Sequence, residues 1–258
     1  MFLDKFPKFT AGRVLKNDML SALRDYPRDY INILYSSYSD GVLAGCTLQV
    51  NSESISIAPG LIRHQGKLYI LSQVASVDYT ANGQDTLVKV SFNKEKESGD
   101  YLLASGDILI TPGLKLAESE LELCRFKLKA GARLRDDYQD FTDFATEYDT
   151  VNIISVPFAA PYESTLSPIL TRRFASEALA GRPVHPFDYA FISQCAKGEP
   201  VARNLITAYT AARLGIVTNE STNQDMHRHL SKILSDIRLG KDMATARGRN
   251  SGRKILVD

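Results

Sequence analysis

The sequence predicts an α+β protein: N-terminal helices, a small antiparallel β-sandwich or barrel, and a helical C-terminal region. Three observations support this. Apolar residues recur at helical spacing before residue 40 and after residue 163. Between residues 41 and 130 they alternate with polar residues, as in strands with one buried face. No helical stretch separates these alternating segments, which favours antiparallel rather than parallel pairing.

The chain has an ordinary globular composition, with 258 residues of which 44% are apolar and 24% are charged. Changes in pattern divide it into five predicted segments. These are an N-terminal helical segment (1–40), a β-module (41–130), an acidic, aromatic connector (131–163), a helical region (164–240) and a basic flexible tail (241–258).

The N-terminal segment is predicted to form two short helices. Leu15, Met19, Leu23 and Tyr26 fall on one helical stripe, and Pro27 is expected to close the first helix because proline cannot donate the next backbone hydrogen bond. A second helix would begin near residue 30.

The β-module is indicated by short runs in which two or three apolar residues alternate with polar neighbours. Cys124 lies in the last of these stretches and is expected to be a small core residue. The string I-x-P-G-L occurs twice, ending at Leu61 and Leu114, and we expect each proline–glycine pair to form a type II turn that ends a strand. Such a turn needs a positive φ at the glycines, Gly60 and Gly113.

The C-terminal region carries helix start and stop signals. Ser167 and Pro168 are an N-cap and first-turn pair, and Gly181 is the expected stop. Asp188 is expected to cap a short helix that runs through Cys195. The remaining signals are a helix opened by Pro200 with Val201, Leu205, Ala208 and Ala212 along one face, and a capping box over Ser221–Gln224 before a helix that ends at Gly240.

The connector contains the candidate functional residues. Tyr138, Phe141, Ala145 and Tyr148 recur at intervals of three and four, which predicts a helix with an aromatic stripe over residues 136–148. One interpretation packs this helix on its own β-module. The other docks it on a partner subunit, with Tyr138, Phe141, Phe144 and Tyr148 as the docking residues.

Charge and cysteine content limit the classes of partner. Thirty-one basic and thirty acidic residues leave a net charge of +1, which argues against nucleic acid or a membrane as the main partner. Three scattered cysteines suit buried thiols in a reducing compartment, and the first residues lack the apolar core of a signal peptide. We therefore expect synthesis and assembly in the cytoplasm.

The sequence predicts neither an enzyme nor a cofactor or metal site. The nearest approach to a phosphate-binding loop, Gly60–Leu68, has one residue too many and a leucine where a hydroxyl is needed. His227 and His229, two residues apart on a helix, point in different directions and are expected to be solvated. There is also no G-x-S-x-G nucleophile motif.

Several short runs together resemble a known family. They are Lys8–Lys16, Leu23–Pro27, Tyr38–Gly41, Ile57–Gly60, Gly66–Tyr69 and Glu120–Phe126. Over about residues 6–175 the chain resembles prophage-encoded tail or baseplate proteins of Gram-positive contractile phages and phage-tail-like particles. The resemblance implies a virion structural protein that contacts other tail or baseplate subunits, and fibre or receptor-binding proteins, within a homo- or hetero-oligomer. It also implies a final location in the particle.

Three functional hypotheses follow. The leading one is a structural baseplate subunit that acts through protein–protein contacts and links the baseplate to fibres or receptor-binding proteins. The alternative is a carbohydrate- or cell-surface-recognition module of the same particle, since small β-domains often present binding loops. The third is a hydrolase with carboxylates scattered along the sequence.

Overall fold

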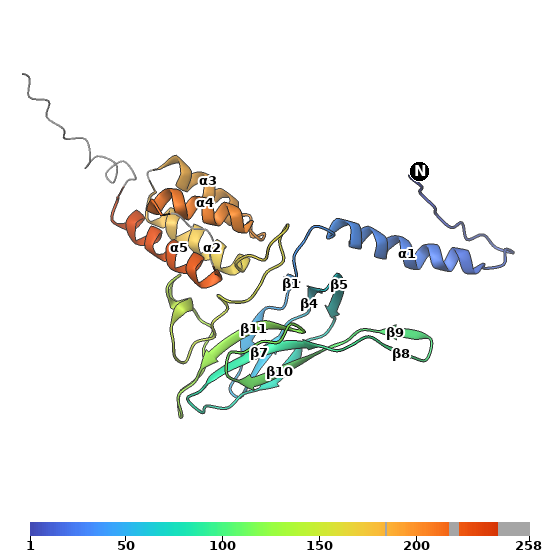
Figure 1. The fold of residues 1–258 in the computed structure, drawn as a ribbon, viewed down its shortest axis with the longest axis horizontal. Coiled ribbons are helices and arrows are strands. Elements are labelled where there is room, and N and C mark those ends of the chain that lie inside the picture. The colour runs from blue at the N-terminus through green and yellow to red at the C-terminus, as the bar shows by residue number, and fades with distance from the viewer. Residues whose placement is uncertain (184, 217–221, 242–258) are drawn as a thin grey trace, which may run out of the picture. The chain divides into compact units, whose positions relative to one another are not determined.

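The computed structural model describes residues 1–183, 185–216 and 222–241 and divides the chain into two compact units, residues 1–38 and 39–258 (Figure 1). The predicted basic tail, apart from Lys241, lies outside the described residues. Among the described residues, no helix is both long enough and apolar enough to cross a membrane.

The first unit contains one helix, α1 (Asn17–Leu34), in place of the two that were predicted. Pro27 lies inside it. Proline removes one backbone donor but has a φ close to the helical value, so a helix can continue past it at an energetic cost. The backbone hydrogen bond from Tyr35 N to Ile31 O, 3.1 Å long, belongs to the last turn. The expectation that Pro27 ends a helix is therefore wrong.

In the second unit the prediction of antiparallel strands is confirmed at a coarse level, as several small sheets. The sheet orders are β1-β4-β5, β2-β3-β6, β10-β7-β11 and the pair β8-β9. The strands are β1 (Gly41–Gly45), β2 (Leu48–Val50), β3 (Ser54–Ile57), β4 (Gly60–His64), β5 (Lys67–Leu71), β6 (Ala75–Asp78), β7 (Asp85–Phe92), β8 (Lys96–Ser98), β9 (Tyr101–Leu103), β10 (Gly106–Pro112) and β11 (Glu120–Lys127).

Strand β7 is the central strand of the β10-β7-β11 sheet and is buried along most of its length. Cys124 on β11 is fully buried beside it, as predicted. Charged residues in this sheet are paired: Lys89 Nζ donates to Glu120 at 2.8 Å, and Arg125 Nε donates to the buried Glu122 at 2.7 Å. Pairing offsets the cost of removing these charges from water.

The two I-x-P-G-L strings behave differently. Gly113 has a φ of +82°, as a type II turn requires. Gly60 has no positive φ and instead opens β4, where it pairs with Gly45 of β1. A Cβ atom on Gly60 would lie 2.4 Å from Cys46 N, so glycine is needed here for close backbone approach. The predicted turn at Gly60 is therefore wrong.

The β8–β9 hairpin is exposed on both strands. Every residue of β8 and β9 is exposed, and the two strands pair with each other through Lys96, Glu97 and Ser98. Gly99 at its tip has a φ of +58°, and a Cβ atom there would meet no neighbour within 4 Å.

The connector does not form the predicted helix over residues 136–148. A short 3-10 turn, η1 (Asp143–Ala145), is its one helical element, and the rest is irregular. Asp143 organises the loop: its carboxylate accepts two hydrogen bonds from Arg135, at 2.6 and 2.8 Å, and others from Gln139 N and Thr146 Oγ1 at 2.8 Å. These contacts pull the backbone away from helical geometry.

Four helices follow: α2 (Pro168–Ala180), α3 (Pro186–Ala196), α4 (Arg203–Leu214) and α5 (Asn223–Arg238). The Ser167 cap is confirmed, since its Oγ accepts from Ile169 N at 3.2 Å. His185, and not Asp188, caps α3, and α4 begins three residues after Pro200. The capping box of α5 is present but shifted by one residue, to Thr222 and Asp225.

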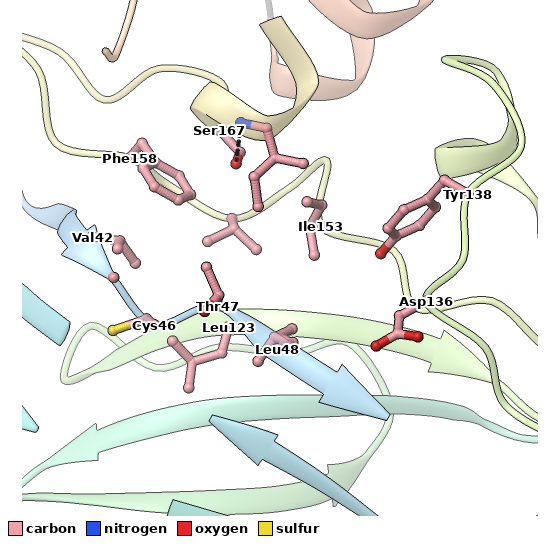
Figure 2. Close-up of a pocket in the computed structure, with 13 residues that line it drawn as sticks. Val42, Cys46, Thr47, Leu48, Leu123, Asp136, Tyr138, Ile153, Phe158 and Ser167 are labelled. Atoms are coloured by element: carbon pink, nitrogen blue, oxygen red, sulfur yellow. Dashed lines mark hydrogen bonds between the residues drawn. The ribbon is translucent and has the colours of Figure 1, made fainter. Parts of the chain in front are cut away.

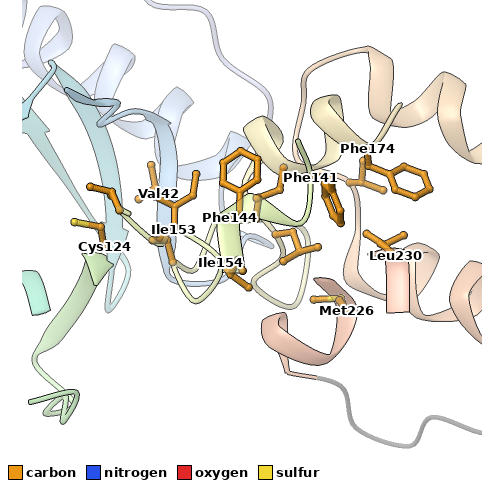
Figure 3. Close-up of a cluster of buried hydrophobic side chains, with 14 of the residues drawn as sticks. Val42, Cys124, Phe141, Phe144, Ile153, Ile154, Phe174, Met226 and Leu230 are labelled. Atoms are coloured by element: carbon orange, nitrogen blue, oxygen red, sulfur yellow. The ribbon is translucent and has the colours of Figure 1, made fainter. Parts of the chain in front are cut away.

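One buried apolar cluster runs through the second unit from the sheets, across the connector, into the helices (Figure 3). Cys124 and Val42 contribute from strands, Phe144 and Ile154 from the connector, and Phe174 from α2. The connector is thus part of the core and joins the sheet packing to the helix packing.

Candidate interaction site

A cavity of about 280 Å³ lies where the β1–β2 turn, β11, the connector and the start of α2 meet (Figure 2). Its lining is mainly apolar. The lining residues are Val42, Gly45, Cys46, Thr47, Leu48, Leu123, Asp136, Tyr138, Ile153, Val156, Phe158, Ser167 and Ile169.

The polar groups of this cavity are largely engaged by the fold. Asp136 Oδ2 accepts a hydrogen bond from Val50 N at 2.8 Å, and Ser167 Oγ caps α2. Burial raises the pKa of the Cys46 thiol to about 11, so the thiol is neutral at physiological pH and is not an activated nucleophile. The cavity therefore offers apolar contacts, with a carboxylate at one end.

The other two thiols are similarly unreactive. Cys124 and Cys195 are both buried, and burial raises the pKa of each thiol, that of Cys195 to about 12. Among the described residues, no three His, Cys, Asp or Glu side chains are grouped so that they could hold a metal ion.

The four candidate docking residues lie in different environments. Phe141 and Phe144 are buried within this chain. Tyr138 is half-buried: its ring stacks on Phe144 with centroids 3.8 Å apart, and its hydroxyl donates to Val151 O at 2.7 Å. Tyr148 is also half-buried and lies beside Lys129, whose Nζ is 4.1 Å from the ring centroid. Docking of this segment on a partner stays a prediction, and Tyr138 and Tyr148 are the two with exposed surface.

Phe141 is held by both helices that flank it. Its backbone N donates to Glu177 Oε1 of α2 at 2.8 Å, and its carbonyl accepts from His227 Nε2 of α5 at 2.9 Å. The Phe141 ring stacks on the His227 ring with centroids 4.4 Å apart. His227 is therefore buried, and the expectation of a solvated histidine is wrong for this residue because a connector 86 residues away in sequence covers it.

A second apolar surface lies between α3 and α4, around a cavity of about 410 Å³. Phe187 and Leu205 on its walls are 57% and 42% exposed. The residues that line this α3–α4 groove are Phe187, Ala190, Phe191, Gln194, Leu205, Ala208, Tyr209 and Ala212.

The groove corrects the sequence-based view of α4. Of the predicted stripe, Leu205, Ala208 and Ala212 are exposed, and Val201, which precedes α4, is buried. The buried side of α4 carries Ile206, Tyr209 and Thr210. The buried side also holds an ion pair: Arg213 Nε is 2.8 Å from Asp188 Oδ1, which accepts from the Tyr209 hydroxyl at 2.8 Å. Because this side of α4 carries polar residues, the sequence pattern predicts that it faces solvent, whereas the structure buries it. No pattern near these residues in the sequence identifies the groups that they bind.

Comparisons with known proteins show a distant structural likeness and no match in sequence. No family model matches the chain, and no curated protein matches it in sequence. Among solved structures, the fold is similar to that of the crystal structure of TssK, with a TM-score of 0.40 and 10% sequence identity. The match covers 93% of this chain and 70% of that chain.

Proposed function

We propose that the protein is a non-enzymatic structural subunit of a phage-type tail baseplate, and that it acts through contacts with other subunits. The sequence resemblance over residues 6–175 supports the kind of particle. The α3–α4 groove is the observation that supports action through protein contacts, because exposed apolar patches on folded proteins commonly mark interaction surfaces.

The α3–α4 groove is well suited to bind another subunit because buried contacts between α3 and α4 hold its walls in place. The buried Asp188–Arg213 pair and the Tyr209 hydroxyl tie α3 to α4, and the rings of Phe191 and Tyr209 stack with centroids 4.0 Å apart. A surface that is already ordered loses little conformational entropy when a partner binds. The small side chains of Ala190, Ala208 and Ala212 in its lining leave room for close approach by another subunit.

A non-enzymatic role is further supported by the state of the thiols. Burial raises the pKa of all three, which removes them as nucleophiles at physiological pH. The mainly apolar linings of the two cavities described above are likewise typical of packing and docking rather than proton transfer.

The test replaces one residue inside the groove and one just outside it on the same helix. Ala190→Glu places a charge in the groove, whereas Ser193→Glu places the same charge on an exposed position of α3 outside the lining. Tail particles would be purified from a strain that carries the gene, and the subunit quantified by mass spectrometry. We expect the wild type and Ser193→Glu in particles, and Ala190→Glu to be lost from them while the isolated protein keeps its melting temperature.

Absence of the wild-type protein from purified particles would reject the proposal. Equal incorporation of both variants would reject the groove as the contact surface. Binding to purified wall polysaccharide without incorporation would favour the recognition-module hypothesis.

A further inference from the structure

Helix α1 is amphipathic, and its own unit leaves most of its apolar side exposed. The structure describes all 18 residues of α1, and none of them is buried. Tyr26, Tyr30 and Ile33 are 57%, 61% and 73% exposed. Hydrophobic residues at 19, 23, 26, 30 and 33 are spaced four, three, four and three apart, which is the heptad spacing of a helix that packs against other helices.

Such a helix needs packing to be stable. Isolated helices shorter than roughly 12–15 residues are marginal in water even in favourable sequences. The 18 residues of α1 exceed that length only slightly, and Pro27 removes one backbone hydrogen-bond donor from the helix interior. Propensity alone therefore does not account for α1, and an apolar contact along its stripe would.

Most charges of α1 lie away from this stripe. Asp18, Arg24, Asp25 and Arg28 fall at outer heptad positions, and Arg24 pairs with its neighbour Asp25 at 2.6 Å. Beside the stripe stand Leu20, Pro27 and Leu34 on one side, and Ala22 with the single flanking charge, Asp29, on the other. Copies of α1 can therefore approach along the stripe without bringing rows of like charge together.

We propose that α1 packs with the α1 helices of other copies of this chain, in a parallel bundle of three or more. At roughly 1.5 Å per residue α1 is about 27 Å long, so a pair touching along the heptad positions alone would cover too little of the roughly 800 Å² per partner that stable interfaces bury. In a bundle of three or more, each helix contacts two neighbours, and Leu20 and Leu34 also become buried. Closed cyclic symmetry makes the helices parallel. The inference does not rest on the proposed function.

The first experiment measures self-association of the full chain by sedimentation velocity over a range of concentrations. Leu23→Glu combined with Tyr30→Glu places two charges on the stripe. Ser21→Glu combined with Asn32→Glu adds the same two charges at outer positions of the same helix. We expect the stripe variant to weaken assembly on the order of a hundredfold or more, and the outer variant to assemble like the wild type.

The second experiment asks whether α1 meets its own counterpart. In a parallel bundle, Ile33 of one chain faces Ile33 of the next, whereas Asn32 points outward. Ile33→Cys should therefore form a reducible intermolecular disulfide under mild oxidation, and Asn32→Cys should not. The wild type, with Cys124 and Cys195 buried and Cys46 half-buried, reports any background.

Each experiment can overturn the proposal. A wild-type chain that remains monomeric at every concentration contradicts it, and so does assembly that the stripe variant leaves unchanged. Equal cross-linking at residues 32 and 33 contradicts α1-to-α1 contact even if the chain assembles. Particle incorporation, the readout for the proposed function, is measured separately and can fail without affecting these results.

Discussion

Helix α1 and residues 138–148 of the connector carry nearly the same sequence pattern and have opposite structures. Both place aromatic or apolar residues at intervals of three and four. In α1 the backbone is helical and no side chain is buried. In the connector most of the backbone is irregular, yet Phe141 and Phe144 are fully buried. The spacing identifies residues that can share a face, but it does not determine backbone form or burial.

The difference lies in where each backbone finds its hydrogen-bond partners. In α1 they are four residues away within the helix. In the connector, Glu177 of α2 and His227 of α5 supply side-chain partners for the backbone of Phe141. Arg135, within the connector, binds the side chain of Asp143. Tertiary partners can therefore replace helical hydrogen bonds and fix aromatic side chains in a core.

The largest effect expected is that of Phe141→Ala. The ring is completely buried between His227 and Phe174, so its removal leaves a cavity and should lower the free energy of unfolding by about 3–5 kcal/mol. Chemical denaturation followed by circular dichroism measures this. Tyr148→Ala, at a half-buried site, is the matched aromatic control, and an equal loss in both variants would contradict the role assigned to Phe141.

Next in size is the loss of the carboxylate that organises the loop. Asp143→Ala removes the two bonds from Arg135 and those from Gln139 and Thr146, and should cost about 1–3 kcal/mol. Asp137→Ala is the control, since Asp137 is exposed and lies 3.6 Å from the same arginine. An unchanged unfolding midpoint for Asp143→Ala would show that the loop does not depend on this carboxylate.

The contacts of Asp143 also predict that the stability of the fold decreases in acid. Hydrogen bonds from Arg135 hold the pKa of the Asp143 carboxyl well below its usual range. The folded state therefore releases this proton more readily than the unfolded state. Its contribution is complete above the unfolded pKa of about 3.9 and is lost as the pH falls further. In Asp143→Ala, measured at the same pH values, this part of the acid sensitivity should disappear.

His227 should make the protein less stable under mildly acidic conditions. Burial lowers the pKa of its imidazole, and the bond to Phe141 O opposes this more weakly. The unfolded state then binds a proton first as the pH drops. The contribution of His227 to the free energy of unfolding is present above the unfolded pKa of about 6.5. Below that pH the contribution declines, with a slope of at most about 1.4 kcal/mol per pH unit. A His227→Gln variant whose stability keeps the same slope over pH 5–7 would contradict this.

The smallest effect is expected in α1. Because Tyr26 is exposed, Tyr26→Ala should change the free energy of unfolding of the second unit by no more than about 0.5 kcal/mol, measured on dilute, monomeric protein. A larger loss would mean that this residue supports the core of residues 39–258, and the contrast between the two regions would be weaker than described.

Local signals in the sequence predicted what local chemistry determines. The Ser167–Pro168 start of α2 and the positive φ of Gly113 are set by residues within a few positions, and the alternation of apolar and polar residues around Cys124 is itself a local pattern. Gly60 was assigned wrongly because its requirement comes from β1, a different strand. The string I-x-P-G-L therefore corresponds to two different backbone structures, one at Gly60 and one at Gly113.

The candidate sites depended on longer-range contacts and were predicted less well. The burial of Phe141 needs Glu177 and His227, which are 36 and 86 residues away. The exposure of Leu205 follows from the Asp188–Arg213 pair, which draws the opposite side of α4 inward. A single sequence carries no pattern that pairs an aspartate on one helix with an arginine on another.

The exposed β8–β9 hairpin has a practical consequence for locating the protein in a large assembly. Gly99 and Asp100 connect two strands that pair with each other, and no neighbour lies where a Cβ atom on Gly99 would be. A short epitope inserted between them should leave the rest of the sheet packing undisturbed, because exposed loop tips tolerate insertions. Antibody labelling of that epitope would mark this hairpin in electron micrographs and, in particles of the proposed kind, would give the orientation of each copy.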